Sequence, residues 1–239
     1  MEEIACAMPF ASRLRRAIRC RSWPPIGLVE TYFRAICWSL RPSAASAFTR
    51  SPSTAVPRRY GFHGVLKAPF HLSADMSEPQ LLRDLMRYAG TFAPFQISRL
   101  EIARLGSFYS LMPSAPCEQI QYLASAIVQE FDRYRAPLSE ADIERSDPDG
   151  LSAAQFANLH RWGNPYVMDE FRFHMPVTGS INAIDMPRIE PALRTIFEPV
   201  LKEPVMVSNV ALMIEEGAGG PFRVHSLHPM GKVSARRIA

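Results

Sequence analysis

The sequence predicts an α+β protein with two lobes, in which two antiparallel sheets flank a central cleft and helices lie outside. Two observations support this fold class. A run of strand, helix, strands and helix is followed by strand, helix and strands, roughly one module used twice. Each module also begins with a strand-like segment that carries a histidine, "YGFHGVLKAPF" at residues 60–70 and "FRFHMPVTG" at residues 171–179.

The first module begins with the expected strand at residues 60–70. A helix should follow, with Ser77 as its N-cap, Gln80 completing a capping box, and Gly90 at its end. Strands are expected at residues 95–103 and 106–112, joined tightly at Gly106. Residues 117–134 give the clearest helix, with apolar side chains at helical spacing: Ile120, Leu123, Ala124, Ile127, Val128 and Phe131.

The second module follows two short helices, expected after Ser139 and after Ser152, the latter ending near Gly163. It comprises a strand at residues 171–178, a helix at about 188–201 weakened by Pro191 and Pro199, and two closing strands at 204–214 and 221–227. The alternation breaks near Asn209, which is typical of a bulge.

The composition indicates a globular protein in a reducing, cytoplasmic setting. A chain of 239 residues can bury a substantial core. Its hydrophobic content is 47%, yet no uncharged apolar run reaches membrane-spanning length, so no membrane partner is expected. The four cysteines have neither metal-binding spacing nor the density of a disulfide-rich protein.

The first 57 residues differ from the rest. Residues 1–59 carry a net charge of +7 and the remainder −3, so the overall pI of about 9.0 does not favour a nucleic-acid partner. The segment holds three of the four cysteines and two of the three tryptophans, is rich in Arg and Ser, and shows no clear strand or capped helix. We expect residues 1–57 to be poorly ordered and not native to the fold, residues 58–231 to form the domain, and 232–239 to be a basic tail.

Two origins for this opening segment remain open. An organelle transit peptide has such a composition. An out-of-frame or replaced start in a GC-rich coding sequence would also give it, and we favour this second interpretation.

The two histidines are the candidate functional residues. Side chains alternate along a strand, so residues two apart share a face. The residues expected on the cleft faces are His63, Val65 and Lys67 in the first strand and His174, Pro176 and Thr178 in the second. Phe62 and Phe173 should point the other way, into the core. Spacing alone leaves open whether each histidine is a hydrogen-bonded structural residue or a catalyst.

Five segments carry a family resemblance: "RRYGFHGVLKAPFHL", "LGSFYSLMPSAPC", "FDRYRAPLSEAD", "RWGNPYVMDEFRFHMPVTG" and "PFRV". Over residues 58 to about 231 the chain resembles a family encoded in bacterial phosphonate-degradation operons, within the two-histidine phosphoesterase superfamily. The resemblance implies two lobes that each contribute an H-x-T/S motif. It also implies chemistry on cyclic or 2′–5′ phosphodiesters without an essential metal or other cofactor.

The resemblance implies a role for each candidate residue. His63 and His174 would be the acid–base pair, since imidazoles titrate near neutral pH. The other candidates, expected to contact phosphate or substrate, are Lys67, Thr178, Tyr60, Arg161 and Tyr166. The chain departs from the family pattern where Val65 and Pro176 replace the motif hydroxyls, and where the family's first strand is not recognisable in residues 1–57.

The expected function is therefore a metal-independent phosphodiesterase on a small cyclic ribose phosphate or nucleotide, linked to phosphonate metabolism. The alternative is a non-catalytic phosphate- or nucleotide-binding protein of the same fold. A metal site of His63, His71 and His174 ranks lower, because it lacks nearby carboxylate or cysteine ligands. The sequence has no G-x-x-x-x-G-K-[ST] loop, which excludes a P-loop kinase.

Overall fold

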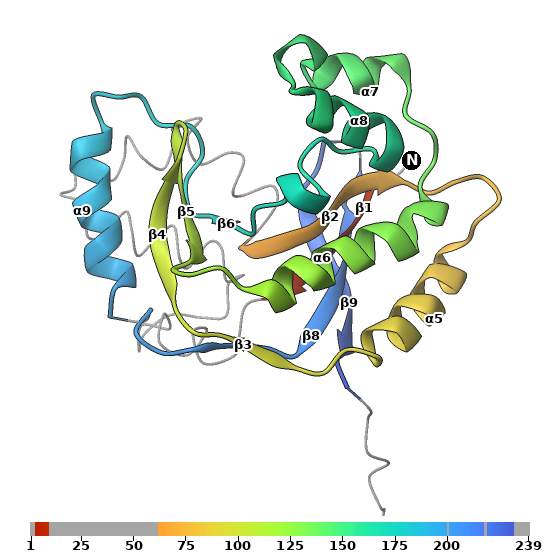
Figure 1. Ribbon diagram of the computed structural model, residues 1–239, viewed down its shortest axis with the longest axis horizontal. Coiled ribbons are helices and arrows are strands. Elements are labelled where there is room, and N and C mark those ends of the chain that lie inside the picture. Colours follow the sequence, from red (N-terminus) through yellow and green to blue (C-terminus); the bar gives the residue numbers. More distant parts are fainter. Residues whose placement is uncertain (1–2, 10–61, 200, 218, 232–239) are drawn as a thin grey trace, which may run out of the picture.

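The computed structural model describes residues 3–9, 62–199, 201–217 and 219–231, the first range by its backbone pairing alone (Figure 1). The strands in this part of the chain are β1 (Glu3–Pro9), β2 (His63–His71), β3 (Phe95–Ile97), β4 (Leu100–Leu105), β5 (Phe108–Pro113), β6 (Met175–Pro176), β7 (Val205–Val207), β8 (Asn209–Glu215) and β9 (Phe222–Pro229). The α-helices are α5 (Glu78–Ala89), α6 (Glu118–Phe131), α7 (Glu140–Arg145), α8 (Ala153–Trp162) and α9 (Met186–Phe197), and the 3₁₀ turns include η2 (Asp132–Tyr134) and η4 (Met168–Glu170).

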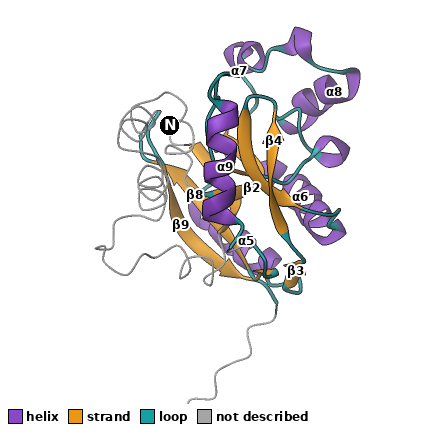
Figure 2. Ribbon diagram, turned by 90° about the vertical axis from the view of Figure 1, so that its left-hand side faces the viewer, coloured by secondary structure: helices purple, strands orange, loops and turns teal. Residues whose placement is uncertain are grey.

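The fold is α+β with two lobes, as predicted. The first lobe is an antiparallel four-stranded sheet, in the order β2-β1-β8-β9, whose one face is covered by α5 and α6. The second lobe is the three-stranded sheet β4-β5-β6 with α9 packed beside it. Figures 1 and 2 show α9 on the far side of β4 from the first lobe.

A third, two-stranded sheet, β3-β7, marks where the chain passes between the lobes. After β3 the chain enters the second lobe at β4, and after β7 it enters the first lobe at β8. The predicted strands at 95–103 and 204–214 are therefore each two strands in different sheets. The break expected as a bulge near Asn209 is this change of sheet, at Ser208.

One apolar core runs through both lobes. It joins the inner faces of α5 and α6 to β8, and α9 to β5; among its members are Leu81, Leu85, Leu123, Ile127, Leu212, Leu111 and Leu193. Each of these side chains is almost fully buried. Since the two lobes share this core, the position of one sheet constrains the position of the other.

The expectation that residues 1–57 contribute no strand is wrong for Glu3–Pro9. This segment is β1, which pairs antiparallel with β2 along one edge and with β8 along the other. Because two partner strands fix its position, β1 does not need a strong local alternation signal. The remainder of the 1–57 expectation, and the basic tail at 232–239, lie outside the described residues.

The strand predicted at residues 171–178 is mostly irregular. Only Met175 and Pro176 pair, with Leu111 and Ser110 of β5. Pro176 has no N–H to offer to a ladder, and this confines proline to edges such as this one. His174 therefore precedes the strand rather than lying within it.

Candidate active site

His63 is the first residue of β2 and is buried, with 6% of its surface exposed. Burial disfavours the imidazolium and lowers the pKa of His63 from 6.5 to about 4. The side chain is therefore neutral near neutral pH, and its free ring nitrogen can accept a proton.

The two histidine segments meet through Gly64 and Phe173. A Cβ built on Gly64 would overlap the ring of Phe173, closer than real Cβ contacts allow, so only glycine permits this approach. Phe173 is buried in the common core, as predicted from sequence. Figure 1 likewise shows β6 in the space between β5 and β2. The residues next to the two histidines thus lie side by side, and His63 leaves β2 on the face opposite Gly64.

His174 is more exposed than His63 and lies just before β6. Its Nδ1 is 2.8 Å from the carbonyl oxygen of Arg172. A carbonyl can only accept a hydrogen bond, so Nδ1 carries the proton and Nε2 remains for other partners. The imidazole lies beside the Phe108 ring, with centroids 6.1 Å apart.

Lys67 does not share a face with His63 as predicted, because β2 contains a bulge. Val65 pairs with Ala7 and Lys67 with the adjacent Cys6, so Leu66 is an extra residue opposite β1. The bulge turns Lys67 toward the helix-covered face, where its ammonium lies 5.3 Å from the centre of the Phe70 ring.

The ammonium of Lys67 is part of a buried ionic cluster. Its Nζ lies 3.1 Å from Oδ1 of Asp132, which Arg135 also holds through two hydrogen bonds of 2.8 and 3.1 Å. Burial alone would raise the pKa of Asp132, but the hydrogen bond from Arg135 and the charge of Lys67 outweigh it and hold this pKa below its ordinary value. The predicted role of Lys67 in binding phosphate would require this pair to open.

Thr178 is buried and structurally engaged. Its Oγ1 accepts a hydrogen bond of 3.0 Å from the backbone N–H of Tyr109, while its own N–H donates to the carbonyl of Tyr109. The hydroxyl proton of Thr178 is still available to a ligand, and its role in binding phosphate stays a prediction.

The remaining residues predicted from sequence are Tyr60, Arg161 and Tyr166. Tyr60 is outside the described residues. The guanidinium of Arg161 lies 4.7 Å from the ring centre of its neighbour Trp162, and its carbonyl accepts a 3.2 Å hydrogen bond from Arg135. Tyr166 is exposed, with its N–H bound to Asn164. In the part of the chain that the structure describes, no hydrogen bond, ion pair or ring contact joins Arg161 or Tyr166 to His63 or His174.

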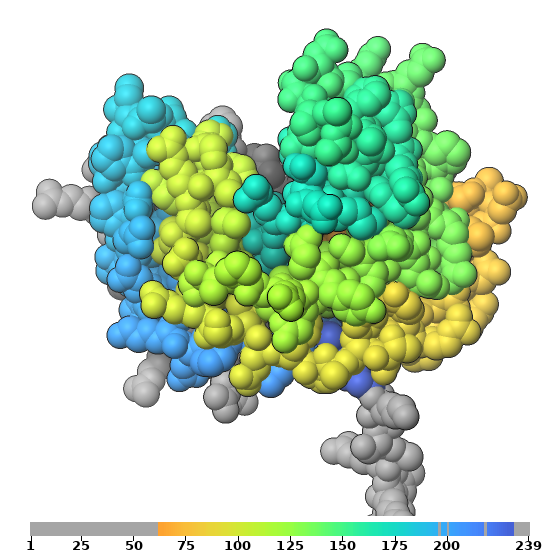
Figure 3. Space-filling view, in the orientation of Figure 1, coloured from red at the N-terminus to blue at the C-terminus, as the bar shows by residue number. Residues whose placement is uncertain are grey.

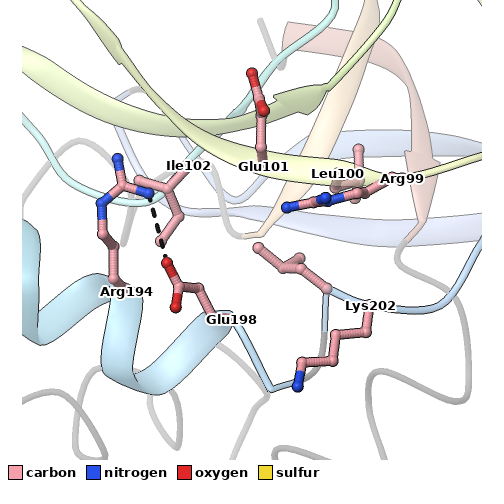
Figure 4. Close-up of a pocket in the computed structure, with 8 residues that line it drawn as sticks. Arg99, Leu100, Glu101, Ile102, Arg194, Glu198 and Lys202 are labelled. Atoms are coloured by element: carbon pink, nitrogen blue, oxygen red, sulfur yellow. Dashed lines mark ion pairs between the residues drawn. The ribbon is translucent and has the colours of Figure 1, made fainter.

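The surface is hollowed between the second lobe and the α7–α8 region, as Figure 3 shows. A separate pocket of about 540 Å³ opens between β4 and the end of α9 (Figure 4). It is lined by Arg99, Leu100, Glu101, Ile102, Arg194, Glu198, Leu201 and Lys202. None of the site residues predicted from sequence lines this pocket, so we do not place the chemistry there.

Ser110 was missed by the sequence reasoning. It lies on β5 directly opposite Pro176, is fully buried, and its hydroxyl has no hydrogen-bond partner in the described part of the chain. The signal in the sequence was a lone serine in the otherwise largely apolar strand "FYSLMP".

Neither a metal cluster nor a membrane-spanning helix is found in the described ranges. No three His, Cys, Asp or Glu side chains there are grouped so as to hold a metal ion. Among the same residues, every helix is too short or too polar to span a bilayer.

The chain belongs to the protein family described as "Protein of unknown function (DUF1045)", whose model matches residues 65–223. Two curated relatives carry the name "Ribose 1,5-bisphosphate phosphokinase PhnN". The protein from Janthinobacterium sp. (strain Marseille) is 34% identical over 176 residues, which are 72% of this chain and 39% of the relative. The protein from Laribacter hongkongensis (strain HLHK9) is 33% identical over 183 residues, 77% of this chain and 42% of the relative. The chain thus spans about two fifths of the length of these relatives.

Solved structures of E. coli LigT also align with the chain. The apo structure covers 97% of this chain and 99% of its own, with a TM-score of 0.45 and 13% identity. The structure complexed with phosphate covers 97% and 98%, with a TM-score of 0.46 and 14% identity.

Proposed function

We propose that this chain is a metal-independent phosphodiesterase that opens a small cyclic ribose phosphate or nucleotide, with His63 and His174 as its acid–base pair. The observation that supports this most strongly is the packing of Phe173 onto Gly64. This contact holds the two histidine segments side by side, although they are more than a hundred residues apart in sequence.

The two imidazoles take different roles in this proposal. His63, neutral because it is buried, removes a proton from the attacking water. The water oxygen forms a new bond to phosphorus as the bond to a ribose oxygen breaks. His174, acting as the imidazolium, gives its Nε2 proton to that leaving oxygen, while its Nδ1–H stays bound to the Arg172 carbonyl. The product is a phosphate monoester beside a free hydroxyl.

The name of the longer relatives supports ribose as the sugar. An enzyme so named acts on a ribose with phosphates on C1 and C5. Hydrolysis of a cyclic diester shared by the C1 and C2 oxygens of a ribose 5-phosphate, with release of the C2 oxygen, would give such a compound. We do not assign the phosphokinase activity itself to this chain, which has no P-loop.

The test is ³¹P NMR of the purified protein in EDTA with two substrates, a 2′,3′-cyclic nucleotide and a 1,2-cyclic ribose phosphate. The proposal expects the cyclic diester signal to be replaced by that of a single monoester, and faster for the ribose phosphate. Turnover that appears only after a divalent metal is added would contradict the metal-independent mechanism.

A second candidate is a non-catalytic phosphate-binding protein. The observation that favours it is the side chains of Val65 and Pro176, which cannot donate a hydrogen bond where the resemblance expects hydroxyls. Calorimetry with inorganic phosphate and the ³¹P assay separate the candidates, because tight binding without product formation favours this one. Turnover gained only by the double variant Val65→Thr, Pro176→Thr would indicate a degenerate enzyme.

A further inference from the structure

The hydroxyl of Ser110 is buried and without a partner. The residue is 0% exposed, and its Oγ makes no hydrogen bond in the described part of the chain. Leaving a buried hydroxyl unpaired costs about 1–3 kcal/mol, so such groups are rare in folded proteins and call for an explanation.

The position of Ser110 links it to the second histidine motif. Ser110 of β5 is the direct cross-strand partner of Pro176 in β6, and such partners share a face with their Cβ atoms about 5 Å apart. Phe108, two residues earlier on β5 and so on the same face, lies against the ring of His174. Ser110 therefore lies on the β5–β6 face that carries Pro176, the same face on which Phe108 meets the ring of His174.

The other hydroxyls around this strand pair are already engaged. Thr178 Oγ1 accepts from the N–H of Tyr109, and the phenol of Tyr109 donates to Glu190 at 2.9 Å on the α9 side. By contrast, the hydroxyl of Ser110 uses neither its proton nor its lone pairs in a hydrogen bond within the described residues.

We propose that Ser110 supplies, from the neighbouring strand, the hydroxyl that the second histidine motif lacks at Pro176. Its O–H donates a hydrogen bond to a non-bridging oxygen of the phosphoryl group on which His174 acts. This assignment rests on the proposed function. A donor in a water-shielded position stabilises developing charge more strongly than one at the surface, which compensates for the missing motif side chain.

Contact with substrate requires Ser110 to be uncovered at β6. This strand is two residues long and Pro176 cannot donate to the ladder, whereas Val177 and Thr178, just after it, both donate to the Tyr109 carbonyl. A small displacement of β6 on phosphate binding would expose Oγ while Tyr109 and Thr178 keep their bonds.

The experiment compares Ser110→Ala with Ser180→Ala, a control on the same lobe whose exposed hydroxyl binds Ser107. Hydrolysis of a cyclic ribose phosphate in EDTA, inorganic phosphate binding by calorimetry, and the thermal midpoint are measured for each. We expect Ser110→Ala to lower kcat about a hundredfold and to weaken phosphate binding. Its thermal midpoint should be unchanged or higher, because an unsatisfied group has been removed. Adding Pro176→Ser to Ser110→Ala should restore part of the lost rate.

Two outcomes overturn the assignment. If wild type turns over and Ser110→Ala matches it in rate and phosphate affinity, the hydroxyl has no role and the proposed function still stands. If wild type neither hydrolyses the diester nor binds phosphate, the proposed function is wrong and the Ser110 assignment is wrong with it.

Discussion

The burial of His63 links the proposed chemistry to stability. Its pKa is 6.5 in the unfolded chain and about 4 in the fold, so between these values the unfolded state binds more protons. The contribution of neutral His63 to the free energy of unfolding is fully present above pH 6.5 and is lost as the pH falls toward about 4. A shift of this size corresponds to about 3 kcal/mol of unfolding free energy.

Urea unfolding across this pH window tests the burial of His63. The free energy of unfolding should fall by about 3 kcal/mol more in wild type than in His63→Gln, which cannot titrate there. His228, whose pKa is also lowered by burial, contributes equally to both proteins and cancels. Parallel curves for the two proteins would mean that His63 is solvated in the fold.

Asp132 binds two largely buried cations, Lys67 and Arg135. Removing Asp132 should therefore cost more than removing one of its two partners. Asp132→Asn would remove the carboxylate charge that Lys67 and Arg135 share, and we expect a loss of about 3 kcal/mol. Lys67→Met should cost about 1 kcal/mol, because Asp132 keeps Arg135. Chemical denaturation measures both, with Glu198→Gln, from an exposed pair with Arg194 of 3.5 Å, as a control expected to change little. A larger loss for Lys67→Met than for Asp132→Asn would contradict this account.

At the scale of the elements, the contact of β2 with the segment before β6 depends on Gly64. Gly64→Ala must displace the buried ring of Phe173, and we expect a loss of about 1–3 kcal/mol together with a lower rate, because His174 moves with its neighbour. Gly90→Ala is the matched control, since its Cβ would make only ordinary contacts, the nearest at 3.4 Å.

A double-mutant cycle makes this contact testable. Phe173→Leu should relieve the overlap, so the double variant Gly64→Ala, Phe173→Leu should be more stable than the sum of the single changes predicts. Additive effects would show that the two residues do not touch.

The helices could be predicted from sequence because their signals are local. Ser139 and Ser152 cap α7 and α8 by accepting hydrogen bonds from the N–H groups of Asp142 and Gln155, each at 3.2 Å. Gly163 ends α8 with a positive φ of 76°, as its position suggested.

The strands were harder to predict because pairing between distant segments determines them. The bulge that turns Lys67 away from His63 depends on the register with β1. The irregular backbone before Met175 and the unpaired hydroxyl of Ser110 likewise follow from tertiary packing rather than local pattern. The proposed acid–base pair, His63 and His174, and the face of Phe173 could be suggested from sequence, whereas Asp132, Arg135 and Ser110 could not.

At the scale of the whole molecule, β1 joins the two halves of the first sheet. This strand lies between β2 and β8, so its removal would leave β2 and β8 each with one unpaired edge. Deletion of residues 1–9 should abolish cooperative unfolding and cause aggregation, as measured by circular dichroism and gel filtration. Deletion of residues 233–239 is the control, and a folded, monodisperse protein after the first deletion would show that β2 and β8 do not need β1.

The central claim is that His63 and His174 act together on one phosphodiester. The most direct test is the rate of cyclic ribose phosphate hydrolysis in EDTA by wild type, His63→Ala, His174→Ala and the double variant. The account predicts that each single variant loses about a thousandfold in kcat and that the double variant loses little more, since the pair works as a unit. Single variants that retain most of the wild-type rate, or losses that simply multiply in the double variant, would contradict it.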